Sequence, residues 1–410
     1  MRAVPQIRNR IMNRETSQIR MKGTVAAISL LLLAAGAVQA KTKKEAAPSK
    51  PVQLVWPLPP EKPRIKFIGA IYGAADFEGV KKANFLDRLA GVQKTDIKPF
   101  FLKPYGIATD SKNRIYVSDS IQGLIFVFDR DNKKVTYIGK GGQVSLAVPL
   151  GMAVDSKDRL WVADAAGQHV YAFDVDSNAL MALGGSGEMT NPTDVAVDEA
   201  RHRLYVTDST GQRVLVYDPE SGQAIAKFGT RGPDPGQFNF PTFVAVDAQG
   251  NIYVTDTLNF RVQVFDPQYK FIQSFGQQGN RFGQFNKPKG IALDSYQNIY
   301  VVDSDFCNFQ IFDQKKNLLM FLGGWGPMPG HFMLPAGIAI DRQNFIYVTD
   351  QDNHRIQIFQ LLDGATDAPA PVKGKMETTK IETKGGDAGV TLGSGPQKSF
   401  SETQKEKTTP

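Results

Sequence analysis

Residues 241–276 read PTFVAVDAQGNIYVTDTLNFRVQVFDPQYKFIQSFG, and residues 288–323 repeat the pattern as PKGIALDSYQNIYVVDSDFCNFQIFDQKKNLLMFLG. Each stretch contains four short runs rich in Val, Ile, Tyr and Phe, and Asp, Gly, Asn or Pro separates the runs. The first group of residues favours strands and the second favours turns. None of the runs has the three-to-four-residue period of an amphipathic helix. Each stretch therefore predicts four short β-strands joined by turns.

This pattern occurs six times along the 410-residue chain. Each unit begins with a proline, and successive prolines lie 43 to 49 residues apart: Pro104, Pro149, Pro192, Pro241, Pro288 and Pro335. Four strands in a period of about 40 to 50 residues are typical of one blade of a β-propeller. The sequence therefore predicts an all-β fold, a six-bladed β-propeller of four-stranded blades.

The sixth unit lacks its fourth strand, because the apolar pattern stops near residue 363. The missing strand is predicted at the other end of the chain, where residues 64–73 read RIKFIGAIYG. Pairing of this segment with the last unit closes the ring and removes two exposed sheet edges. We therefore expect the propeller to span residues 64–363, closed by an N-terminal strand.

The units resemble the NHL-repeat family, whose repeats read P-x-G-I-A-V-D, then G-N-I-Y-V-A-D, then N-x-R-I-Q-V-F. The resemblance covers about residues 65 to 362 and is strongest at Asn259-Phe260-Arg261 and Asn353-His354-Arg355. The first unit departs from it, with Leu124 in place of the arginine. The resemblance implies a six-bladed propeller, in agreement with the repeat count.

Residues 1–40 are expected to be a signal segment, with Met21 as a possible true start. Residues 21–40 read MKGTVAAISLLLLAAGAVQA, a lysine followed by an apolar run and a small-residue cleavage pattern. An uncleaved anchor is the alternative, although the run is shorter than the roughly 20 residues of a membrane-spanning helix. We therefore expect a periplasmic or secreted protein with no integral membrane span after signal removal.

Three further segments lie outside the repeats. Residues 41–63 form a Lys- and Pro-rich linker, and residues 364–410 contain few apolar residues, so we expect the tail to be disordered. The insertion at 74–103 contains FEGVKKANFLDRLAG (77–91), whose apolar residues follow a helical period. We expect a short helix across or beside the channel mouth; a strut on the outer rim is the alternative.

The charge and cysteine content narrow the function. The chain has 48 basic and 41 acidic residues, and removal of residues 1–40 leaves 42 and 40, a net charge of +2. This balance offers no electrostatic footprint for nucleic acid. Cys307 is the single cysteine, so no internal disulfide is possible. We expect Cys307 to be a buried apolar residue and the protein to be a monomer; an intermolecular link is the alternative.

Recurring polar and aromatic residues are expected to stabilise the blades. One aspartate ends the second strand of every unit: Asp119, Asp164, Asp208, Asp256, Asp303 and Asp350. Each is expected to accept hydrogen bonds from its own turn or from the arginine five residues on, although a ring of carboxylates around a cation is an alternative. The four histidines do not occupy equivalent positions. We therefore expect no metal site and no cofactor.

The least repetitive parts of the units are the loops between blades and the turns between second and third strands, which share one face of a propeller. The candidate ligand- or partner-binding residues in them are His169, Phe260, Phe306, His354, Lys289 and Trp325. Phe260 and Phe306 are expected to be exposed at turn tips, as in a binding surface; packing against a neighbouring blade is the alternative. This favours an exported, non-enzymatic scaffold that binds another exported or cell-envelope protein or other ligand. The alternative is an enzyme resembling peptide-amidating lyases or lactonase-like hydrolases, which hold a metal near the channel.

Overall fold

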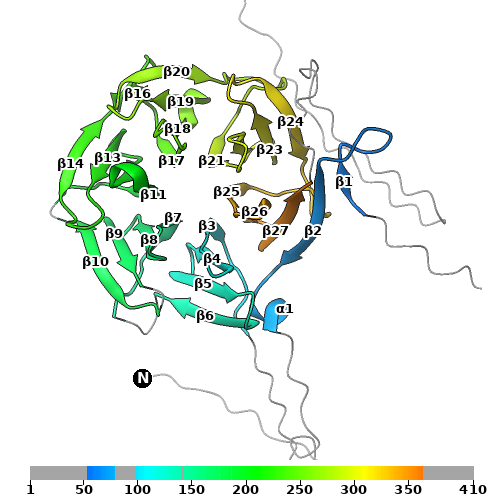
Figure 1. Ribbon diagram of the computed structural model, residues 1–410, viewed down its shortest axis with the longest axis horizontal. Coiled ribbons are helices and arrows are strands. Elements are labelled where there is room, and N and C mark those ends of the chain that lie inside the picture. The colour runs from blue at the N-terminus through cyan, green and yellow to red at the C-terminus, as the bar shows by residue number, and fades with distance from the viewer. Residues whose placement is uncertain (1–52, 79–97, 140–142, 175, 186, 363–410) are drawn as a thin grey trace, which may run out of the picture. The chain divides into compact units, whose positions relative to one another are not determined.

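The computed structural model describes residues 53–78, 98–139, 143–174, 176–185 and 187–362. Figure 1 shows six antiparallel sheets arranged around a central axis, with the first strand of each sheet innermost. The six innermost strands contact one another around the ring. The all-β, six-bladed propeller predicted from the repeats is confirmed.

Each of the first five blades uses four consecutive strands. Blade 1 contains β3 (Pro104–Thr109), β4 (Arg114–Asp119), β5 (Leu124–Asp129) and β6 (Lys134–Ile138). Blade 2 contains β7 (Pro149–Val154), β8 (Leu160–Asp164), β9 (His169–Phe173) and β10 (Ala179–Gly184). Blade 3 contains β11 (Pro192–Asp198), β12 (Arg203–Asp208), β13 (Arg213–Tyr217) and β14 (Ala224–Phe228).

Blades 4 and 5 follow the same plan. Blade 4 contains β17 (Pro241–Val246), β18 (Ile252–Asp256), β19 (Arg261–Phe265) and β20 (Phe271–Phe275). Blade 5 contains β21 (Pro288–Leu293), β22 (Ile299–Asp303), β23 (Asn308–Phe312) and β24 (Leu318–Gly323). Two short strands, β15 (Thr230–Arg231) and β16 (Gln237–Phe238), pair in the loop that leads into blade 4.

The sixth blade joins the two ends of the described chain. It contains β25 (Pro335–Ile340), β26 (Phe345–Asp350), β27 (Arg355–Leu361) and, outside them, β2 (Ile65–Ile71). β2 pairs antiparallel with β27, from Ile65 opposite Leu361 to Ile71 opposite Ile356. The predicted closure by an N-terminal strand is thus confirmed. A short strand within the expected linker, β1 (Val55–Trp56), adds a fifth strand beside β2.

Aromatic residues of the second strands fill the spaces between blades, as predicted. Trp161, Tyr205, Tyr253, Tyr300 and Tyr347 are almost fully buried. Tyr347 of blade 6, for example, packs with Ile107 and Ile115 of blade 1. Because each blade buries its aromatic residue against the next, the core runs around the ring without a break.

The aspartates that end the second strands hold the loops that precede their own blades. Asp119 accepts hydrogen bonds from the amides of Leu102 and Lys103, and Asp350 accepts one from Met333. Where the third strand begins with arginine, the guanidinium also binds this aspartate, as in the Arg355–Asp350 pair at 2.8 Å. Burial raises the pKa of Asp256, Asp303 and Asp350. These carboxylates therefore have a structural role in their own blades, as expected.

The insertion at 74–103 begins with helix α1 (Ala74–Glu78), which lies at the rim of the ring in Figure 1. Phe77 packs edge-on against Phe128, and the Glu78 carboxylate accepts a hydrogen bond from the Val135 amide of outer strand β6. The described start of the insertion therefore packs on the rim beside blade 1, through Phe77 and Glu78. The rest of the expected helix falls within 79–97 and lies outside the described residues.

The expected signal segment 1–40 and the expected disordered tail 364–410 also lie outside the described residues. Within the part of the chain that the structure describes, no helix is long and apolar enough to cross a membrane. Cys307 is a buried free cysteine, and burial raises the pKa of its thiol.

Candidate functional site

The two faces of the ring differ in their exposed side chains. We call the face with the blade-to-blade loops and the turns between second and third strands the loop face, and the opposite face the turn face. Eight of the fourteen exposed large apolar side chains in the described residues lie on the loop face: Tyr72, Phe100, Leu102, Ile121, Phe240, Leu258, Trp325 and Met328. Tyr296 lies on the turn face, Leu58 lies in the β1–β2 turn at the same end of the ring, and the other four lie on outer strands. Such a concentration is typical of an interaction surface.

Four of these apolar side chains gather where blade 6 meets blade 1. Phe100 bridges to Gly73, next to Tyr72, and the Phe101 amide binds the Tyr72 carbonyl at 2.9 Å. The side-chain amide of Gln122, which follows Ile121, donates to the Phe100 carbonyl at 2.9 Å. We call Tyr72, Phe100, Leu102 and Ile121 the seam cluster. The Asp119 carboxylate also accepts hydrogen bonds from the amides of Leu102 and Ile121, so the backbone segments that carry these side chains lie next to one another.

The loop between blades 5 and 6 presents two of the three most exposed large apolar side chains on the loop face, the third being Ile121. Trp325 is 69% exposed and Met328 is 60% exposed. The loop itself is firmly held, because the guanidinium of buried Arg355 donates to the carbonyls of Pro327, Met328 and His331 at 2.8, 3.1 and 2.8 Å. Because the backbone of this loop is already fixed, a partner that covers Trp325 loses little free energy to ordering of the loop.

Aromatic side chains meet across the central channel. Tyr105 of blade 1 stacks on Phe243 of blade 4, with ring centres 5.5 Å apart and planes 13° apart. The innermost strands approach so closely that a side chain at Gly106 or Gly337 would overlap a neighbouring carbonyl oxygen. Asp194 is buried beside the stack and accepts a hydrogen bond from the Val244 amide at 3.0 Å. Burial raises the pKa of both Asp194 and Tyr105.

A lysine lies at the loop-face end of this stack. The Lys289 ammonium is 5.4 Å from the centre of the Tyr105 ring, a cation–π arrangement. Burial, together with the positive charges of Lys287 and Lys103, lowers the pKa of Lys289 from 10.5 to about 8, while Asp305 and Asp352 oppose the shift. Perturbed groups in such positions are candidates for a functional role.

Three of the six predicted site residues lie on the side of the loop face formed by blades 5, 6 and 1. Trp325 is exposed, and Lys289 lines the channel. His354 is exposed and its Nδ1 lies 2.8 Å from the Leu102 carbonyl of the seam cluster. The turn that carries His354 also touches the Trp325 loop, because Asn353 donates to the Gly326 carbonyl at 3.0 Å.

The other three predicted residues lie apart from this group. Phe260 and Phe306 are half-buried, so the expectation that they are exposed is wrong. Phe260 ends a 3₁₀ turn with φ of 57°, and Leu258 in the same turn is exposed instead. His169 is half-buried in blade 2, stacks on Tyr171 at 5.5 Å and binds the Gly167 carbonyl.

The sequence reasoning missed Met328, the seam cluster and the Tyr105–Phe243 stack. The sequence does mark Phe243 as unusual, because four of the six units have glycine at this position and Phe243 replaces it with a large aromatic residue. Among the described residues, no group of three or more His, Cys, Asp or Glu side chains is arranged to hold a metal ion.

Comparison with known proteins places these observations in a wider context. The NHL repeat matches residues 238–265 and 332–359. No curated protein sequence matches the chain.

Solved structures share the fold at low identity. A structural genomics protein of unknown function from Bacteroides thetaiotaomicron has a TM-score of 0.52 and 18% identity, over 64% of this chain and 70% of that one. An auxiliary nutrient binding protein from Bacteroides ovatus has a TM-score of 0.52 and 15% identity, over the same shares of the two chains. A gluconolactonase from Xanthomonas campestris has a TM-score of 0.50 and 17% identity, over 64% of this chain and 87% of that one. The chain is a six-bladed β-propeller that carries NHL repeats.

Proposed function

We propose that this protein is an exported, non-enzymatic scaffold whose loop face binds another exported or cell-envelope protein. The observation that carries the proposal is the gathering of eight exposed large apolar side chains on this face, against Tyr296 and Leu58 at the opposite end of the ring. The structure from Bacteroides ovatus named an auxiliary nutrient binding protein has the same fold, which gives a precedent for binding on this scaffold at the level of fold only.

The geometry supports a contact area built around the blade 5, 6 and 1 side of the loop face. Trp325 and Met328 lie on one part of it and the seam cluster on another, and the His354 turn connects the two. Tryptophan is the residue most typical of interface hot spots. Covering Trp325 and Met328 with a partner contributes roughly 1.5 to 3 kcal/mol for each side chain.

The lysines at the channel mouth indicate which charge the partner presents to this face. Lys103, Lys287 and Lys289 lie close enough for their charges to act on one another. An acidic side chain of the partner placed against Lys289 relieves this repulsion and restores the charged form of the lysine. We therefore propose a partner that presents an aspartate or glutamate surrounded by apolar residues.

The test compares one double variant with a control from the opposite face. Trp325→Ser combined with Met328→Ser removes the two apolar side chains, and Tyr296→Ser removes the exposed aromatic residue of the turn face. Partners retained from a periplasmic extract are identified by mass spectrometry, and the purified partner is titrated by calorimetry. We expect the double variant to bind at least about tenfold more weakly at an unchanged melting temperature. Equal affinity of the double variant, or an equal loss in Tyr296→Ser, contradicts the proposal.

The second candidate is a propeller enzyme with a metal near the central channel, and Lys289 is the observation that favours it. An amine with a pKa of about 8 is partly uncharged near neutral pH and is able to act as a base or nucleophile. Metal analysis of the purified protein discriminates between the candidates. Stoichiometric zinc, calcium or iron together with lactone hydrolysis that Lys289→Met abolishes supports the enzyme.

A further inference from the structure

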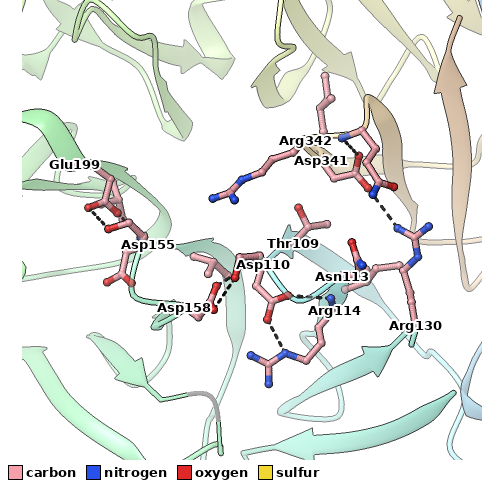
Figure 2. A pocket seen from close by; sticks show the side chains of 17 residues that line it. Thr109, Asp110, Asn113, Arg114, Arg130, Asp155, Asp158, Glu199, Asp341 and Arg342 are labelled. Atoms are coloured by element: carbon pink, nitrogen blue, oxygen red, sulfur yellow. Dashed lines mark hydrogen bonds and ion pairs between the residues drawn. The ribbon is translucent and has the colours of Figure 1, made fainter. Parts of the chain in front are cut away.

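The turn-face end of the channel holds a cavity of about 400 Å³, shown in Figure 2. Its lining comes from blades 1, 2, 3 and 6, and includes the last residue of β3, Thr109. Tyr105 is the second residue of the same strand. The cavity and the Lys289 site therefore lie at opposite ends of the innermost strand, with the Tyr105–Phe243 stack at the loop-face end.

Charged side chains divide this cavity into two halves. Glu199, Asp155 and Asp158 come from blades 2 and 3, and Figure 2 shows them together on one side. Arg342 and Arg130 come from blades 6 and 1 on the other side. Arg130 is an ion-pair partner of Asp341 at 3.3 Å and binds the Tyr347 hydroxyl at 2.8 Å. Because Asp155 is already paired with Arg159 at 2.6 Å and Arg130 with Asp341, the charges without an ion-pair partner in the described lining are Glu199 and Asp158 in one half and Arg342 in the other.

At five of the six seams between blades, a residue just after the innermost strand of one blade forms a turn-face hydrogen bond with the next blade, whereas at the sixth, between blades 6 and 1, Arg130 binds Asp341. Ser111 binds Asp158, Ser156 binds Glu199, Arg201 binds the Gln249 carbonyl, the Ala248 amide binds Gln297, and the Ser295 amide binds Asn344. At the seam between blades 6 and 1, the equivalent residue is Arg342. This side chain is exposed and makes no hydrogen bond or ion pair within the described residues.

The free guanidinium of Arg342 extends toward the middle of the cavity mouth in Figure 2. A guanidinium offers two parallel N–H donors that match a carboxylate. Opposite it, the exposed Glu199 carboxylate accepts one hydrogen bond at each oxygen from Ser156, at 2.5 and 2.8 Å. A carboxylate has about four acceptor positions, so each oxygen keeps capacity for a further donor.

We propose that this cavity binds a zwitterionic amino acid or short peptide, with its carboxylate on Arg342 and its ammonium between Glu199 and Asp158. A volume of about 400 Å³ lies within the usual range for small-molecule sites. The two halves reject ligands that carry one charge, because such a ligand leaves the opposite half without its counter-ion. The site is separate from the loop face and does not rest on the proposed protein partner.

The test uses calorimetric titration of the full chain with each of the twenty standard amino acids and with the dipeptide Gly-Gly. Matched probes are the N-acetylated forms, which lack the ammonium, and the amide forms, which lack the carboxylate. We expect at least one zwitterion to bind, and its single-charge forms to bind at least about tenfold more weakly. Absence of binding by every zwitterion overturns the proposal, as does equal binding of an N-acetylated form.

Two variants test the position of the site, and two others serve as controls. Arg342→Gln and Glu199→Gln are both at exposed positions and are expected to weaken binding at least about tenfold without changing the melting temperature. Lys270→Gln changes an exposed residue in a turn of the same face, away from the cavity, and is expected to bind normally. The Trp325→Ser, Met328→Ser variant is expected to bind normally too, which separates this site from the loop face. Unchanged affinity in Arg342→Gln refutes the assignment.

Discussion

Replacing Lys289 with methionine tests whether the positive charge of this lysine at the channel mouth destabilises the folded state. The substitution keeps a straight apolar side chain and removes the ammonium. The pKa of Lys289 falls from 10.5 to about 8 in the fold. Each pKa unit corresponds to about 1.4 kcal/mol, so the charged lysine costs the folded state roughly 3 kcal/mol relative to the uncharged one.

The sign of the pH dependence follows from proton binding. Between pH 8 and 10.5 the unfolded chain holds a proton on this amine that the folded chain has released, so stability of the wild type rises with pH. Below pH 8 both states are protonated and the cost is present in full. Lys289→Met lacks this cost at every pH. We therefore expect the variant to be more stable than the wild type at pH 7, and the difference to shrink by about 2 kcal/mol between pH 8 and 9.5.

Urea unfolding at pH 7, 8, 8.75 and 9.5 measures this difference directly. Exposed Lys270→Met is carried through the same series as a background control. A constant difference between Lys289→Met and wild type across the series refutes a buried, destabilised charge at the channel mouth.

The remaining predictions concern packing. Deleting residues 41–73 removes β2 with its buried Ile65 and Ile71, and is expected to cost more than about 4 kcal/mol in urea unfolding, whereas deleting 366–410 is expected to leave stability unchanged. Equal stability of the two truncations contradicts closure by β2. Gly151→Ala places a methyl group against the carboxylate of buried Asp194, and we expect a loss of about 1 to 3 kcal/mol. A thermal melt that matches wild type shows that the inner ring has more room than the structure indicates.

Most of the ring could be predicted from sequence because a blade is a local unit. Each blade forms from consecutive strands, so its prolines, aspartates and alternating apolar residues recur at a fixed period. The exception is β2, and it could still be predicted because a four-stranded unit lacking one strand leaves an edge that must be covered. The pairing of Ile65 with Leu361 spans nearly the whole propeller, yet it follows from the count of strands.

The binding surfaces could not be predicted in the same way, because they depend on side-chain direction and on contacts between distant units. Phe260 and Leu258 occupy the same turn, and no pattern in the sequence shows that Leu258 is the more exposed of the two; His354, at the position equivalent to Phe260, is exposed although its φ is also positive. Tyr105 and Phe243 belong to the first and fourth units, and their stacking across the axis has no local pattern. Arg342 is one of six equivalent positions. Four of them, Ser111, Ser156, Ala248 and Ser295, bind the next blade, in blade 3 Arg201 makes this bond instead, and only the structure shows that Arg342 makes none among the described residues.

Recognition through the loop face is tested most directly by hydrogen exchange of the protein alone and in complex with its captured partner. We expect slower amide exchange in the complex at residues 98–102, 121–123 and 324–328, and no change in the turn-face segments 156–158 and 342–344. Slowed exchange confined to the turn-face segments, with residues 324–328 unchanged, contradicts binding through the loop face.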